Sequence, residues 1–373
     1  MTLSRQPAYW VFLLLLLAGV GLVGGEQVAY LNSYPAAWFL SILLLAAVAI
    51  PVGLIIYRLD QFEPEPASLI VIALLWGGVV ALSFAAIVNS NFLTFLQGVM
   101  SPKAVSAWGA SIVAPLDEEF YKGAGLVMIF LIARDEIDGL MDGMVYGAMI
   151  GLGFQVVENV QYFVHAAAQS GGSGVGAVIG TFFLRVLIAG LYSHMLFTAL
   201  TGFGFAYFIT RRGAVSWGRR AGVFALFAVA AWAAHFVWNS PWLDSLQQGG
   251  VWAFIGALVI KGLPFLILLL VMGTMARRRE AQAFSRLMTE EIGGDVVTQE
   301  EFDVLRSARR RRRMARQIKR QKGAYAKRLV KRIMREQMNL ALFHTKVEDS
   351  THAAVETQRD KIRQMKAQLA GLR

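Results

Sequence analysis

The sequence predicts an all-α, polytopic transmembrane helix bundle of about eight spans, followed by a basic helical C-terminal tail. Hydrophobic residues make up 56% of the 373 residues, mean hydropathy is +0.51, and only 16% of the residues are charged. Apolar runs of about twenty residues, the length that crosses the hydrocarbon core, recur through the first three quarters of the chain. This composition excludes an ordinary soluble domain. The absence of cysteine excludes a disulfide framework and thiol chemistry.

Eight apolar runs are long enough to be read as membrane spans. The first ends at Gly24 and Gly25 without a good cleavage signature, so we interpret it as a span rather than a removed signal. The fourth and sixth are long enough to be tilted, kinked or broken. The predicted spans are 9–23, 36–57, 68–88, 104–133, 141–165, 175–210, 221–239 and 251–275.

Arginine and lysine residues mark one side of this bundle. Two spans separate each basic position from the next, so all of these positions lie on one face of the membrane. They are Arg5, Arg58, Arg134, the 211–220 loop and the 277–279 cluster. Loops rich in these residues stay in the cytoplasm. With an even number of spans, the pattern predicts that both termini are cytoplasmic.

Spans four to seven contain polar groups that are costly in hydrocarbon. An ionised side chain near the bilayer centre costs at least roughly 2.5–3.5 kcal/mol, so such groups usually serve a function. Counted inward from the cytoplasmic ends at about 1.5 Å per residue, the unusual group of each of the four spans lies at one depth, about 22–25 Å in, in the outer half of the bilayer. This count places Glu118, Glu119, Glu158, His194 and His235, and their common depth predicts one shared cavity. With their polar neighbours on the same helices, the candidate site residues are Glu118, Glu119, Lys122, Glu158, Asn159, His194, His235 and Asn239.

Local spacing indicates which of these groups share a helix face. Lys122 follows Glu118 and Glu119 by four and three residues, so it can neutralise one carboxylate while the other keeps a like charge beside it. Such a pair suits general acid/base chemistry. His235 and Asn239 are also four residues apart, and can polarise water and stabilise an oxyanion.

Four neighbouring residues complete the expectations for this region. Pro115 is predicted to break the helix just before the glutamate pair. Gln155, one turn before Glu158, is predicted to tether that carboxylate. Arg185 is predicted to extend to the outer interface, and His165 to be solvated at the outer rim.

Each polar group also has a structural interpretation, and the set has rival functional ones. His194, Asn159 and Asn239 suit hydrogen bonds between helices, and Glu118 with Lys122 suits a buried ion pair that fixes packing. A transporter could use the same acids and histidines as a proton relay. Transporters often contain inverted repeats, which are not evident in this sequence. A non-catalytic membrane scaffold is a third alternative.

The region of roughly residues 106–243 contains six motifs in order. They are Ala114-Pro-Leu-Asp-Glu-Glu-Phe-Tyr-Lys122, Arg134-Asp-Glu-Ile-Asp-Gly139, Asp142-Gly-Met-Val-Tyr-Gly147, Gly151-Leu-Gly-Phe-Gln-Val-Val-Glu-Asn159, Tyr192-Ser-His-Met-Leu-Phe-Thr198 and His235-Phe-Val-Trp-Asn239. Through these motifs the sequence resembles the PrsW family of polytopic intramembrane proteases. The family is distantly similar to the CAAX prenyl endopeptidases, in which a histidine follows a phenylalanine by four residues. Here Glu158 stands four residues after Phe154, so the resemblance implies that a histidine elsewhere takes that role, and we expect it to be His194.

The resemblance implies proteolysis of a membrane-anchored substrate in the bacterial cytoplasmic membrane. In the type case the substrate is a single-pass anti-sigma factor cut on its extracytoplasmic side. Glu118 or Glu119 would activate water, and His194, His235 and Asn239 would stabilise the oxyanion and protonate the leaving amine. No HExxH motif is present and Lys122 competes for the carboxylates, so we favour a site without a cofactor. The alternative is a zinc ion on Glu119, Glu158, His194 and His235.

The chain divides by charge at residue 276. Residues 277–373 contain 25 Lys+Arg and 12 Asp+Glu, a net charge of +13, whereas residues 1–276 have a net charge of −2. Thr298 and Glu301 have the spacing of a capping box that opens a helix. Beyond it, Ile318, Tyr325, Leu329, Ile333 and Leu340 form a weak apolar stripe among basic residues. We expect this tail to bind anionic lipids or to be a solvated helix, with nucleic acid the least favoured partner.

Overall fold

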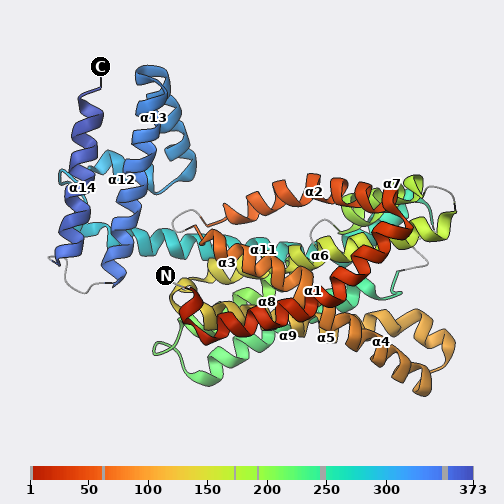
Figure 1. Ribbon diagram of the computed structural model, residues 1–373. Coiled ribbons are helices and arrows are strands. Elements are labelled where there is room, and N and C mark those ends of the chain that lie inside the picture. Colours follow the sequence, from red (N-terminus) through yellow and green to blue (C-terminus); the bar gives the residue numbers. More distant parts are fainter. Residues whose placement is uncertain are drawn as a thin grey trace. The chain divides into compact units, whose positions relative to one another are not determined.

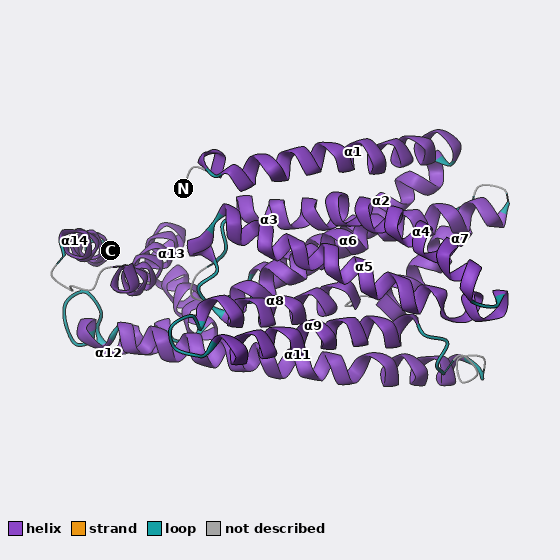
Figure 2. Cartoon of the chain, turned by 90° about the horizontal axis from the view of Figure 1, so that it is seen from below, coloured by secondary structure: helices purple, strands orange, loops and turns teal. Residues whose placement is uncertain are grey.

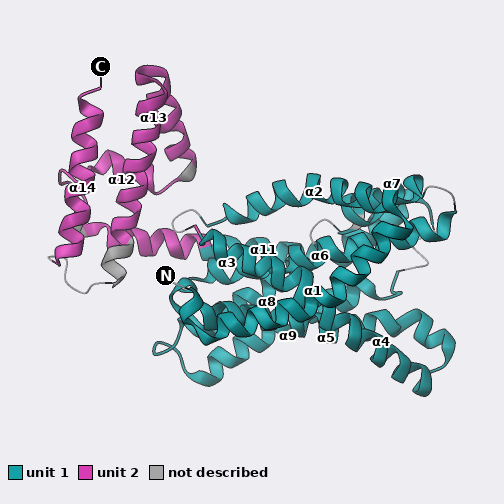
Figure 3. Cartoon of the chain, viewed as in Figure 1, with its two compact units in different colours: residues 1–60, 65–276 teal, residues 61–64, 277–373 magenta. Residues whose placement is uncertain are grey.

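The computed structural model describes residues 3–60, 64–171, 174–190, 193–243, 249–346 and 352–372 (Figure 1). Every regular element within these ranges is a helix (Figure 2). The chain forms two compact units (Figure 3). Unit 1 comprises residues 1–60 and 65–276, and unit 2 comprises residues 61–64 and 277–373.

Seven helices among the described residues are long and apolar enough to cross a membrane, which confirms the predicted polytopic bundle. An eighth long helix, α5 (Pro102–Ile132), corresponds to the fourth predicted span and contains the charged groups Asp117, Glu118, Glu119 and Lys122. The seven are α1 (Pro7–Ser33), α2 (Pro35–Tyr57), α3 with η2 and α4 (Ala67–Val99), α6 (Leu140–Ser170), α7 with η4 and α8 (Val175–Thr210), α9 (Trp217–Asn239) and α11 (Val251–Leu287).

Several helices differ from their predicted limits. Helix α1 runs through Gly24 and Gly25 to Ser33, because glycine weakens a helix without ending it when apolar neighbours continue on both sides. The predicted break at Pro115 is wrong, since α5 is continuous across it. A proline removes only one helical hydrogen bond, which packed membrane helices tolerate. The sixth span is irregular, as expected, with a π-helix η4 over Phe182–Gly190.

Helix α6 forms the centre of unit 1 and positions the polar groups. Twenty-one of its 31 residues are buried. A Cβ atom added at Gly143, Gly147 or Gly151 would lie only 2.2–2.3 Å from backbone oxygens of α8 (Ser193–Thr210), so these glycines bring the two backbones together. On the opposite side, a Cβ at Gly153 would lie 2.2 Å from the Leu74 oxygen of α3 (Ala67–Leu75). This packing fixes the separation of the polar residues on α6 and α8.

Unit 2 has a hydrophobic core of its own. The predicted capping box is present, because Thr298 Oγ1 accepts from the Glu301 N–H at 3.2 Å and Glu301 Oε2 accepts from the Thr298 N–H at 2.9 Å. It opens α12 (Gln299–Leu305). Helix α13 (Ala308–Lys346) bends at Gly323, whose φ of 82° lies in the left-handed region. Its two segments and α14 (Ala353–Ala370) pack together through Ala315, Val330, Met334, Leu340 and Ile362.

The predicted apolar stripe of the tail is only partly buried. Leu329, Ile333 and Leu340 are buried, whereas Tyr325 is 48% exposed. Its hydroxyl accepts a hydrogen bond of 2.6 Å from Gln368 of α14. The buried residues of the stripe therefore stabilise a small helical domain. The weak apolar periodicity of the sequence did not by itself indicate such a domain.

Glu65, just before α3, predicts a pH dependence of stability. Burial and the nearby carboxylates of Asp142 and Asp60 raise the pKa of Glu65 to about 10. The folded state holds this proton more tightly than the unfolded state does. The contribution of Glu65 to the free energy of unfolding is therefore fully present below the unfolded pKa of about 4.3, and it is lost as pH rises toward 10. We expect Glu65→Gln to reduce the fall in apparent melting temperature between pH 6 and pH 9, measured in detergent. The control Asp135→Asn, at an exposed position, should melt like the wild type at both pH values. If the melting temperature of Glu65→Gln fell by as much as that of the wild type between pH 6 and pH 9, the prediction would be contradicted.

Candidate active site

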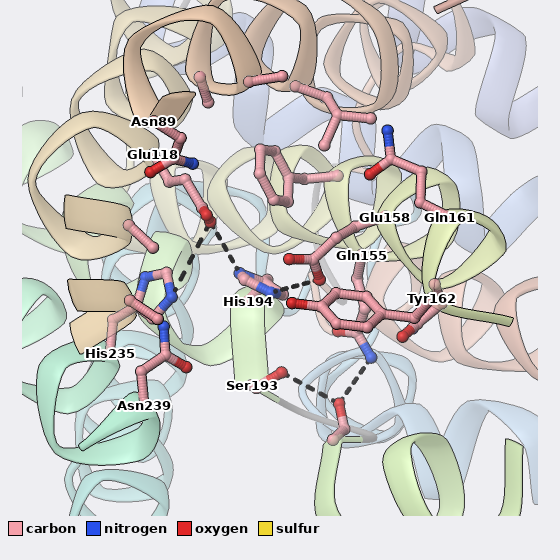
Figure 4. Close-up of a pocket in the computed structure, with 18 of the residues that line it drawn as sticks. Asn89, Glu118, Gln155, Glu158, Gln161, Tyr162, Ser193, His194, His235 and Asn239 are labelled. Atoms are coloured by element: carbon pink, nitrogen blue, oxygen red, sulfur yellow. Dashed lines mark hydrogen bonds and ion pairs between the residues drawn. The ribbon is translucent and has the colours of Figure 1, made fainter. Parts of the chain in front are cut away.

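A cavity of about 500 Å³ lies among α4 (Leu82–Val99), α5, α6, α8 and α9 (Figure 4). It brings together side chains from five separate spans. Six of the eight residues singled out in the sequence line it: Glu118, Glu158, Asn159, His194, His235 and Asn239. The other two, Glu119 and Lys122, are buried directly behind this lining and contact it.

Lys122 is the buried cation of the site. Its side chain is fully buried, and its Nζ lies 2.6 Å from Glu119 Oε1, 3.4 Å from Glu118 Oε2 and 3.0 Å from His194 Nδ1. An ammonium group only donates, so His194 Nδ1 is the acceptor. The hydrogen of the neutral ring is then on Nε2, which donates to Glu158 Oε2 at 3.1 Å. Lys122 and Glu158 thereby fix the tautomer and the orientation of His194.

Glu119 orients the second histidine. His235 Nδ1 lies 2.9 Å from Glu119 Oε1, so this nitrogen donates to the carboxylate. The ring stacks on Phe197 with centroids 5.0 Å apart. Its other nitrogen, Nε2, faces Glu118 Oε2 at 3.9 Å. His235 therefore presents its basic nitrogen toward Glu118, as a histidine held by a carboxylate does in hydrolytic sites.

The Glu118 carboxylate lies between the two imidazole rings (Figure 4). Its Oε2 is 3.9 Å from His194 Nδ1 and 3.9 Å from His235 Nε2. These separations are too long for direct hydrogen bonds. Glu118 lines the cavity whereas Glu119 faces Lys122 and His235, so the two adjacent carboxylates have different surroundings.

Arg185 is a member of the site that the sequence analysis assigned wrongly. It comes from η4, and instead of extending to the outer interface its Nη2 lies 2.8 Å from Glu158 Oε2 and its Nε donates to Asn159 Oδ1 at 2.8 Å. The guanidinium also lies 3.4 Å from the ring centroid of Tyr162. The physical reason is that an unpaired Glu158 would be costly in this environment. The sequence did contain a signal for this pair, because Glu158 has no obvious cation on its own helix and therefore needs one from another helix.

Three further expectations need correction or completion. Gln155 does not tether Glu158, because its Nε2 donates to the Gly190 oxygen at 2.6 Å and supports the end of η4 instead. His165 is exposed, as predicted, but it also lies 3.1 Å from the Tyr30 hydroxyl and lines the cavity. Asn239 lines the cavity one turn after His235, and its backbone oxygen accepts from Ser111 Oγ at 2.9 Å. Tyr192, quoted among the motifs, lies outside the described residues.

The donors that come together for a metal ion are not the set expected from the sequence. Donor atoms of Glu118, His194 and His235 lie within 4.8 Å of one another. Glu119 and Glu158, which the expected zinc set included, instead pair with Lys122 and Arg185. Two imidazoles and a carboxylate suit catalytic zinc, but ligands about 2.0 Å from a tetrahedral ion are about 3.3 Å apart. The two 3.9 Å separations are longer. In this arrangement the Lys122 ammonium also contacts His194 Nδ1, the nitrogen that would face such an ion.

The family relationship follows from a sequence profile. The profile described as "PrsW family intramembrane metalloprotease" matches residues 65–272, more than half of the chain. The chain belongs to the PrsW family. All eight site residues lie inside the matched region.

Two curated relatives agree with this assignment. The protein named Protease PrsW of Geobacillus kaustophilus (strain HTA426) is 31% identical over 149 residues, which is 40% of this chain and 58% of the relative. Protease PrsW of Bacillus subtilis (strain 168) is 27% identical over 166 residues, 43% of this chain and 66% of the relative. The chain thus spans less than two thirds of the length of either relative. No solved structure matches it.

Proposed function

We propose that this PrsW family member is an intramembrane endopeptidase that hydrolyses a peptide bond with water activated by Glu118. The observation that carries the proposal is the position of the Glu118 carboxylate on the cavity side, between two imidazoles that other carboxylates orient. Glu118 Oε2 lies 3.9 Å from His194 Nδ1 and 3.9 Å from His235 Nε2, and a water molecule fits these separations as a bridge. The names of the relatives, both proteases, support the same activity.

The reaction needs one base and one group that carries the proton to the leaving amine. Glu118 takes a proton from water as the water oxygen bonds to the peptide carbonyl carbon. The proton then passes to His235 Nε2, the nitrogen that Glu119 leaves free, and from there to the leaving amine as the C–N bond breaks. Asn239 supplies amide N–H groups to the oxyanion, and Lys122 stabilises the added negative charge from behind the cavity wall.

The substrate class follows from where the site lies. A cavity walled by membrane-spanning helices admits a segment that is already in the bilayer, so we propose single-pass, membrane-anchored proteins resembling anti-sigma factors as substrates. The depth count from the sequence favours cleavage near the extracytoplasmic side of a bacterial cytoplasmic membrane, with both termini of the enzyme in the cytoplasm.

A cleavage assay tests the activity. The chain is co-expressed with a panel of tagged single-pass membrane proteins, and fragments are followed by immunoblotting. We expect fragments with the wild type and none with His194→Ala, although the variant inserts to the same level. The control His165→Ala removes a histidine at the cavity rim and should change the yield of fragments less than about threefold, as expected for a side chain outside the chemistry. Equal cleavage by wild type and His194→Ala would refute the assignment, and proton-coupled flux without cleavage would favour a transporter.

Metal analysis tests the mechanism separately. We expect purified, active protein to retain its cleavage activity after treatment with a chelator and to contain no stoichiometric zinc, because Lys122 occupies the donors. Elemental analysis of wild type and His194→Ala provides the measurement. One zinc per chain that is lost with activity, and lost in His194→Ala, would instead establish a metalloprotease.

A further inference from the structure

The cations of unit 2 are divided unequally between its helices. Residues 304–335 contain 15 Lys+Arg and no acidic residue. Helix α14, by contrast, mixes both signs, and its cations pair with acidic groups of the unit. Arg359 contacts Glu291, Arg363 contacts Asp295, and Lys366 contacts Glu301, with closest separations of 2.5–2.8 Å. The acidic groups near α14 are thus already engaged.

The first segment of α13 presents a row of cations without acidic partners. Arg309, Arg313, Arg316 and Arg320 follow one another at spacings of four, three and four residues, which places them on one helix face. All four are exposed. Within the described part of unit 2, none of them has a carboxylate within 4.0 Å. The opposite face of the same segment is fixed to the core through Ala315 and Ile318.

Like charges at these spacings repel one another, so the row lowers the stability of the helix that contains it. A surface needed only for solubility would mix both signs, as α14 does. Among the described residues of unit 2, no acidic segment covers the row. The arrangement therefore fits a surface whose counter-charge is supplied by another molecule.

We propose that this row, defined as Arg309, Arg313, Arg316 and Arg320, binds the anionic headgroups of the bilayer that the chain itself spans. Helix α11 is continuous from its apolar part into unit 2, so the row is tethered to a membrane surface. Tethering gives a high effective concentration of headgroups even when each contact is weak. The apolar side chains of this segment face the core of unit 2, so the contact is electrostatic and needs no insertion.

A single-cysteine reporter provides the test, since the chain has no native cysteine. The full chain with Gln317→Cys, an exposed position on α13, is labelled with a fluorophore and placed in phosphatidylcholine nanodiscs with or without phosphatidylglycerol. Quenching by a headgroup-attached quencher measures proximity to the bilayer. We expect stronger quenching with phosphatidylglycerol, and its loss at high salt.

Substitution of the row makes the test specific. The quadruple Arg→Gln variant should lose the response, because each cation near an anionic surface changes the partition about fivefold. The quadruple Arg→Lys variant should keep it. Gln364→Cys on α14 is the matched reporter position and should respond less. Equal quenching in both lipid mixtures, or an unchanged response in the Arg→Gln variant, would overturn the proposal.

Discussion

Glu118→Gln is expected to abolish detectable cleavage while leaving the protein folded and inserted. Glutamine keeps the size of the side chain but cannot take a proton from water, so the rate should fall at least about 10²–10⁴-fold, the usual contribution of a general base. The ion pair between Lys122 and Glu119, at 2.6 Å, remains to hold the buried ammonium. The rate of fragment formation from a cleaved single-pass substrate, normalised to the amount of inserted enzyme, is the measurement.

The neighbouring carboxylate of Asp117 is a matched control for this substitution. Asp117 is buried one residue before Glu118 on the same helix, but it is not among the residues that line the cavity. Asp117→Asn should therefore cleave at a rate close to that of the wild type. If Glu118→Gln kept its activity and Glu119→Gln lost it, the roles assigned to the two glutamates would have to be exchanged.

The fold was predictable because its determinants are local. An apolar run of sufficient length becomes a helix in the bilayer whatever surrounds it, since every backbone group must be satisfied within the segment. The convergence of Glu118, His194 and His235 was predictable for a related reason. A charge or imidazole is costly at any unpaired position in hydrocarbon, and similar counts from the helix ends place such groups at one depth.

The pairing of side chains within the site was not predictable in the same way. Glu118 and Glu119 are adjacent in the sequence, and only the packing of α5 against α9 decides which of them faces the cavity. Gln155 was assigned to Glu158 by helical spacing, but the Gly190 oxygen at the end of η4 is a better acceptor for its amide. A π-helix has i→i+5 hydrogen bonds, so its side chains do not follow the angular spacing of an α-helix. Arg185, in that segment, therefore could not be placed by counting regular turns.

Arg185→Met is expected to impair both stability and cleavage, and a second substitution should separate the two effects. Removal of the guanidinium leaves Glu158, whose side chain is 13% exposed, without its cation. Breaking such a pair costs roughly 3–5 kcal/mol when both partners are buried, and the 32% exposure of Arg185 places the expected loss at or below the lower end of that range. Unpaired, Glu158 holds His194 less rigidly, so we also expect cleavage to fall about tenfold, as for the loss of an orienting group.

The double variant Arg185→Met/Glu158→Gln tests whether Arg185 acts through Glu158. Because it leaves no uncompensated charge, it should regain much of the lost melting temperature without regaining cleavage, since a neutral amide no longer holds His194 as a carboxylate does. Arg219→Met, at an exposed position on α9, should behave like the wild type in both measurements. If the double variant recovered cleavage together with stability, Arg185 and Glu158 would be only a structural pair. If Arg185→Met alone left both unchanged, neither the ion pair nor its link to His194 would matter for the site.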